Sequence, residues 1–143
     1  MMKKTLYFLL IIPIFLTAGL NVSKVNIALT SLTITKSHKS PKFFNANKNI
    51  TLHKNLKITS LKNANIVLFS NKISSKLSIV NSYKALRTNK NSIGAIYLKK
   101  GRTQIIFIGE RLKANGLSLP PSFKKNLLSE CQLNPICLVN SLK

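Results

Sequence analysis

The stretch IGAIYLKKGRTQIIFI, residues 93–108, contains the clearest hairpin signal in the sequence. Two apolar segments, Ile93–Leu98 and Gln104–Ile108, flank the polar turn KKGR at 99–102. Gly101 stands where a tight hairpin turn needs a positive φ, which glycine adopts without steric cost. The pattern therefore predicts two antiparallel strands joined by a basic turn.

The residues before this hairpin predict two further strands and a helix. The run IVLF at 66–69 is continuously apolar, as expected of a strand that is buried on both faces. Leu77–Val80 is predicted to form a second short strand. Ser82 is a favourable N-cap for a helix that runs through Arg87 and ends at 89–91.

After the hairpin, the sequence predicts two short helices. The first covers Glu110–Asn115 and stops at Gly116. Residues 117–119 are extended, and Pro121 or Ser122 opens a second helix that continues to Leu128.

The N-terminal half has a more extended pattern. Alternating apolar residues predict one or two strands within Asn21–Lys36, and a strand or hairpin arm at 50–58. Between them, residues 36–49 are polar and are expected to form a loop that Phe43 and Phe44 pin to the core. We therefore predict one small domain over residues 19–143, of mixed α/β (α+β) class, with a mixed β-sheet flanked by short helices.

Residues 1–18 have the three parts of a signal peptide. Lys3 and Lys4 give a positive start, 6–16 is an apolar run, and Thr17-Ala18-Gly19 offers small residues for cleavage after Ala18 or Gly19. The apolar run is shorter than the roughly 20 residues that span a bilayer. These features predict export to the periplasm, and the alternative is an uncleaved N-terminal anchor. No later segment is apolar and long enough to form a transmembrane span.

The charge of the chain is extremely positive. It has 23 Lys and Arg against two Glu and no Asp, which gives a net charge of +21. Such a field attracts anionic partners and opposes self-association. The cations are spread along the chain, so a merely solvated basic surface is the alternative. Nucleic acid is a disfavoured partner, because no recognised motif occurs and the leader points outside the cytoplasm.

The two cysteines, Cys131 and Cys137, predict a disulfide. An even pair at short spacing in an oxidising compartment is most simply bridged. Free thiols and a metal or redox site are the alternatives, but the spacing is not C-x-x-C. The histidines, His38 and His53, are far from the cysteines in sequence. No metal site and no cofactor are predicted.

Catalytic residues are not evident in the sequence. Glu110 and Glu130 are the only acids, and nothing in the sequence places them together. The absence of Asp disfavours Asp-supported histidine hydrolases and multi-carboxylate metal sites. No nucleophile or nucleotide motif occurs, so we predict a protein that is not an enzyme.

The turn of the opening hairpin is the candidate contact for an anion. Lys99, Lys100 and Arg102 surround a flexible glycine, and such a tip can hold a phosphate or carboxylate by charge and backbone N–H groups. A solvated turn without a ligand is the alternative. Tyr97, just before the tip, can stack on a ligand or pack into the core.

The segment from Asn65 to about Leu128 resembles the C-terminal half of YfiR-like periplasmic proteins. The likeness lies in IVLFS at 66–70, GAIY at 94–97, GR at 101–102, NGLSL at 115–119 and a closing helix with Leu127-Leu128. The resemblance implies an exported α/β protein that restrains a membrane-bound signalling partner by binding its periplasmic part. The chain departs from the family in a shorter, more strand-like N-terminal half and in cysteines crowded at the C-terminus.

Taken together, the sequence predicts an exported, non-enzymatic binding protein. Its partner is expected to be an acidic protein domain or an anionic envelope surface. The alternative is a periplasmic solute-binding or sensory module for a small anion, which requires a concave pocket with convergent Lys or Arg side chains.

Overall fold

The two longest strands form the predicted hairpin, β5 (Ser92–Lys99) and β6 (Arg102–Ile108). Lys100 and Gly101 both have a positive φ, 51° and 72°, as the two central residues of a type I′ turn require. Gly94 lies opposite Phe107 in the antiparallel ladder. A Cβ on Gly94 would stand only 2.7 Å from a ring carbon of Phe107, so the glycine makes room for the aromatic ring.

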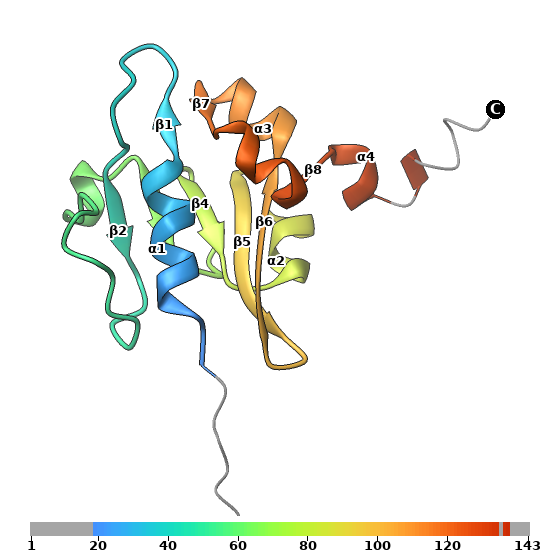
Figure 1. Cartoon of the computed structure of the whole chain (residues 1–143). Coiled ribbons are helices and arrows are strands. Elements are labelled where there is room, and N and C mark those ends of the chain that lie inside the picture. Colours follow the sequence, from blue (N-terminus) through green and yellow to red (C-terminus); the bar gives the residue numbers. More distant parts are fainter. Residues whose placement is uncertain (1–18, 135, 138–143) are drawn as a thin grey trace, which may run out of the picture.

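A six-stranded mixed sheet is built around this hairpin in the computed structural model, which describes residues 19–134 and 136–137 (Figure 1). The strand order is β2-β3-β4-β5-β6-β8. Strands β2 to β5 are parallel, β6 is antiparallel to β5, and β8 is parallel to β6. The bounds of the other four strands are β2 Phe43–Asn45, β3 Ile66–Leu68, β4 Leu77–Val80 and β8 Leu127–Leu128. The predicted single small α/β domain is confirmed.

Short helices and a small second sheet complete the domain. Strands β1 (Thr33–Ile34) and β7 (Leu117–Ser118) pair antiparallel as a two-stranded sheet. The predictions for β3, β4 and the helices that follow β4 and β6 are confirmed. The helices are α1 Val22–Ser31, α2 Tyr83–Thr88, α3 Gly109–Ala114 and α4 Glu130–Leu133, with 3-10 turns η1 Leu61–Asn63 and η2 Pro121–Asn126.

The prediction of strands between Asn21 and Lys36 is wrong over most of its length, because α1 occupies it. Val25, Ala28 and Leu29 are fully buried, and their spacing of three and four residues is that of one helix face. Ile27, which made the segment look alternating, is 58% exposed. The Asn21 side chain accepts a hydrogen bond from the Lys24 N–H and so caps the helix.

Three smaller predictions also need correction. Residues 43–45 form β2 and not a loop, although Phe43 is fully buried as expected. The predicted strand at 50–58 is irregular, and only Ile58 forms a β-bridge, to Phe43. The predicted helix to Leu128 is a 3-10 turn that ends at Asn126, after which the chain joins the sheet as β8.

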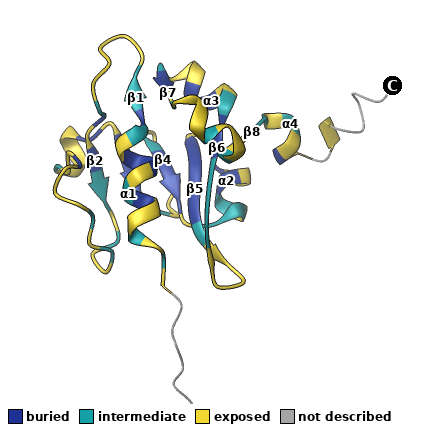
Figure 2. Cartoon of the chain, in the orientation of Figure 1, coloured by how far each residue is buried: buried dark blue, intermediate teal, exposed yellow. Residues whose placement is uncertain are grey.

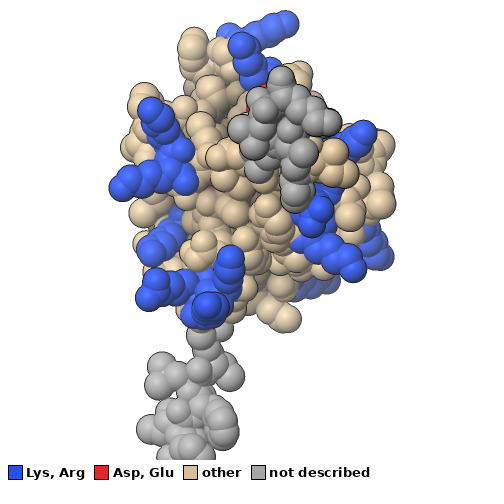
Figure 3. Space-filling view, turned by 90° about the vertical axis from the view of Figure 1, so that its right-hand side faces the viewer, with Lys and Arg blue, Asp and Glu red and all other residues tan. Residues whose placement is uncertain are grey.

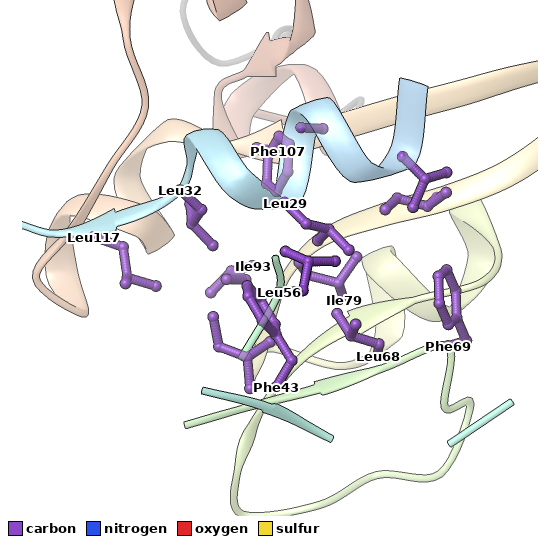
Figure 4. Close-up of a cluster of buried hydrophobic side chains, with 14 of the residues drawn as sticks. Leu29, Leu32, Phe43, Leu56, Leu68, Phe69, Ile79, Ile93, Phe107 and Leu117 are labelled. Carbon is purple, nitrogen blue, oxygen red and sulfur yellow. The ribbon is translucent and has the colours of Figure 1, made fainter. Parts of the chain in front are cut away.

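The two faces of the sheet have separate hydrophobic clusters. Helix α1 covers one face, where its Leu29 belongs to one buried cluster with Phe43, Ile79 and Phe107 (Figure 4). Helix α2 covers part of the other face, where its Leu86 packs with side chains of β4, β5 and β6. The buried segments in Figure 2 follow the central strands and the inner side of α1.

No helix in the described part of the chain has the length and apolar character to cross a membrane. The predicted signal peptide, residues 1–18, lies outside the described residues.

Candidate functional site

Arg111 of α3 is the centre of the most elaborate polar cluster. Its side chain is only 9% exposed. Its Nη1 donates hydrogen bonds to the carbonyl oxygens of Leu86 (3.0 Å), Asn89 (3.2 Å) and Ser92 (2.7 Å). These carbonyls lie at and just beyond the C-terminal end of α2, where helix carbonyls lack partners within the helix. Those of Leu86 and Asn89 also accept from the Ser92 hydroxyl. Arg111 therefore ties α2, α3 and the start of β5 together.

Both carboxylates of the protein meet near this arginine. Glu130 accepts from Arg111 Nε and, at 3.1 Å, from Nη2, which makes a two-pronged ion pair. The Glu110 carboxylate accepts from the backbone N–H of Glu130 at 3.1 Å. The two glutamates are 20 positions apart in the sequence, which gives no reason to expect this contact. Both acids serve to seat α4 against α3.

A cavity of about 600 Å³ opens beside this ion pair. Its walls come from α2 and α4, from the chain just after each of these helices, and from Arg111 of α3. The lining residues are Lys84, Arg87, Thr88, Lys90, Arg111, Glu130, Leu133 and Asn134. Four of these side chains are cationic and one is anionic, so the cavity has an excess of positive charge.

Three of the cavity's cations are exposed in the part of the chain that the structure describes. Lys84, Arg87 and Lys90 are exposed, and no hydrogen-bond acceptor for their side chains occurs among the described residues. Arg111, in contrast, has all its contacts within the protein. Figure 3, viewed from the right-hand side of Figure 1, shows Lys and Arg around the margins of the visible face.

The predicted hairpin tip forms a separate basic feature. Lys99, Lys100 and Arg102 are all exposed, and Lys99 is the cross-strand partner of Arg102. Like charges directly opposite each other repel, so an anion between them would be favourable. None of the three lines the cavity at α2 and α4.

Tyr97 lies in the stem of the same hairpin and packs against the second hydrophobic cluster. Burial, and to a smaller extent the neighbouring Tyr83, raises the pKa of Tyr97. The phenol therefore remains neutral at pH 7 and acts as a packing residue there.

The Cys131 and Cys137 sulfurs are 2.09 Å apart, as in a disulfide. The bridge closes the loop that begins in α4 and thereby holds the wall of the cavity that Leu133 and Asn134 form.

Within the described residues, no three His, Cys, Asp or Glu side chains are close enough to hold a metal ion. His53 Nδ1 accepts from the Asn55 N–H at 3.2 Å, and His38 is exposed in a turn.

The sequence indicated one of the two basic features and missed the other. The hairpin tip was visible because its cations are adjacent in sequence. The cavity was missed because Arg111 and Glu130 are 19 positions apart, and only the tertiary fold brings them to α2.

Comparison of the chain with protein-family models, with curated proteins and with solved structures found no match.

Proposed function

We propose that this chain is an exported, non-enzymatic protein of the periplasm that binds an acidic segment of a partner protein. The cavity between α2 and α4 is the principal site, and the hairpin tip is a second contact. The observation that carries the proposal is the group of exposed cations Lys84, Arg87 and Lys90 at one cavity, without acceptors among the described residues.

Electrostatics favours an anion in this cavity. The one carboxylate that lines it, Glu130, is already bonded to Arg111. An acidic side chain entering the cavity would meet the remaining cations without having to displace that pair. Exposed cations also accelerate encounter with an acidic partner, and this effect weakens as salt increases.

Both glutamates already accept hydrogen bonds within the protein, which supports a role of the protein in binding over one in catalysis. Glu110 and Glu130 accept hydrogen bonds that fix α4, so each already has a structural task. The resemblance to YfiR-like proteins, which covers the segment from β3 to β8, supports a partner of a particular kind. That partner would be the periplasmic part of a membrane-bound signalling protein, which this chain would restrain.

Binding of a short poly-glutamate peptide tests the proposal. We expect saturable binding in a buffer of low ionic strength and a strong loss of affinity at high salt, because the attraction is between exposed charges. Vesicles containing phosphatidylglycerol provide the comparison with an anionic envelope surface. Tighter binding to the vesicles than to the peptide would favour that surface as the partner.

Three matched variants, each lacking three positive charges, locate the site. The cavity variant replaces Lys84, Arg87 and Lys90 by Gln, and the tip variant does so at Lys99, Lys100 and Arg102. The control replaces Lys48, Lys54 and Lys57, which are exposed in the loop after β2. We expect the cavity variant to lose about tenfold more affinity than the control, and the tip variant to be intermediate. Equal losses in all three would contradict a defined site.

The shape of the same cavity favours a second candidate, a binding module for a small anion. A volume of about 600 Å³ with convergent cations is within the range of small-molecule sites. Citrate would then raise the melting temperature of the wild type and not of the cavity variant. A stabilised wild type that still ignores the acidic peptide would select this candidate over the first.

A further inference from the structure

A second cavity, of about 650 Å³, lies at the carboxyl ends of the parallel strands β2, β3 and β4. It shares no lining residue with the basic cavity. In open sheets with parallel strands, ligands bind outside the carboxyl ends of the strands. The lining residues are Phe44, Ala46, Leu61, Val67, Phe69, Ser70, Asn71, Lys72, Ile73, Ser74 and Asn81.

The floor of this cavity is a part of the sheet that α2 leaves open. Phe44 and Val67 are register partners and therefore lie on one face. Val67 in turn is opposite Ser78, which places both on the face away from α1. Helix α2 packs on β4 and β5 of that face. The apolar side chains beside the floor, Leu61 and Ile73, are 47% and 77% exposed.

Phe69, which follows β3 and is itself a lining residue of the cavity, has an unusual backbone conformation. Side chains alternate along a strand, so Phe69 would follow Val67 onto the cavity face if β3 continued regularly. Its φ is 60°, a left-handed value that is unfavourable for a bulky residue. The aromatic ring consequently packs beside Leu68 in the cluster under α1 (Figure 4). Backbone strain of this type is concentrated at ligand sites, where the surrounding structure maintains it.

The polar part of the lining has one charge. Ser70, Asn71 and Asn81 follow the ends of β3 and β4 and offer neutral hydrogen-bonding groups. Of the described residues that line the cavity, Lys72 is the one with a charge, and none is a carboxylate. An apolar floor with a single cation at its rim is complementary to an amphiphile with one negative charge.

We propose that this cavity binds a small amphiphile that has an apolar body and one anionic head group. The body lies on Phe44 and Val67 between Leu61 and Ile73, and the head group lies near Lys72. The volume is that of a site for a single small molecule. This site is independent of the acidic partner proposed above, because the two cavities have no residue in common.

Decanoate binding, measured by isothermal titration calorimetry, tests the apolar part of the site. We expect one decanoate per chain, and about tenfold weaker binding by the Ile73→Asn variant, because burial of an exposed isoleucine would be lost. Ile73 is 77% exposed, so its replacement does not disturb the core. The matched control is Ile27→Asn, since Ile27 is 58% exposed on α1, and it should bind as the wild type does.

The head-group contact is tested by comparing decanoate with the neutral decanol. Lys72→Gln should weaken decanoate binding and leave decanol binding unchanged, whereas Lys48→Gln should change neither. Several decanoate molecules per chain, equal effects of the Ile73 and Ile27 variants, or no binding of either probe would each overturn the proposal. Losses that are equal for Lys72→Gln and Lys48→Gln would show attraction by net charge alone and would also overturn it.

Discussion

At the scale of single residues, Arg111 makes hydrogen bonds that connect several parts of the structure. It is the one cation that is buried among the described residues, and its guanidinium bonds three carbonyls and a carboxylate. A lysine could supply the charge but not the planar fork that reaches these acceptors together. The arginine thus stabilises the neighbourhood of the basic cavity while the exposed cations around it stay available.

Replacing Arg111 by methionine should lower the free energy of unfolding by about 3 kcal/mol, because buried carbonyls and Glu130 would lose a charged donor. Arg87→Met is the control, since Arg87 is exposed on α2 and should change stability by less than about 0.5 kcal/mol. Urea denaturation monitored by circular dichroism measures both values. Similar stabilities of the two variants would show that the Arg111 contacts contribute little.

At the scale of elements, the sequence predicted the part of the fold between residues 66 and 119 well. Local signals determine it: continuous apolar strands, a serine cap before α2, and glycines with positive φ at 101 and 116. These signals act within a few residues and do not depend on the rest of the chain.

The elements that sequence reasoning missed depend on distant partners. Helix α1 has residues of moderate helix propensity, and its identity as a helix follows from the face it buries against the sheet. Strands β2 and β8 have only three and two residues, so they form because a neighbouring strand is already there. The basic cavity was missed for the same reason, as its walls converge only in the folded chain.

Helix α4 supplies the element-scale prediction, because its four residues are too few for a helix that is stable alone. A Cys131→Ser and Cys137→Ser double variant should lose about 2 kcal/mol of stability, the entropy of closing so short a loop. Hydrogen exchange should accelerate in α4 and remain slow in β5 and β6. Uniform acceleration throughout the sheet would contradict a local role of the bridge.

At the scale of the whole molecule, the charge of +21 acts against the folded state. Cations that are brought together by folding repel, and the described residues contain one salt bridge to offset this. The positive surface therefore lowers the stability of the folded state, and a function that depends on positive charge would explain its presence.

Raising sodium chloride from about 20 mM to about 300 mM should screen this repulsion and increase the melting temperature. If the repulsion amounts to about 1 kcal/mol, the increase should be about 5 °C for a domain of this size. Differential scanning calorimetry measures the change. Potassium chloride at the same ionic strength is the control and should give the same increase, because screening depends on ionic strength. A melting temperature that falls with salt would contradict the prediction.

The hairpin tip has one more consequence, which concerns copies of the chain meeting one another. Strand β4 pairs with β5 only as far as Ala95, and β8 pairs with β6 only at Phe107 and Ile108. Among the residues that the structure describes, the outer half of the hairpin therefore has no neighbouring strand on either side, and such open edges are templates for the addition of strands from other molecules. The exposed cations at its end, Lys99, Lys100 and Arg102, would be brought together whenever two such edges aligned. The same residues that can attract an anionic partner thus discourage the edge-to-edge aggregation to which a protruding hairpin is otherwise prone.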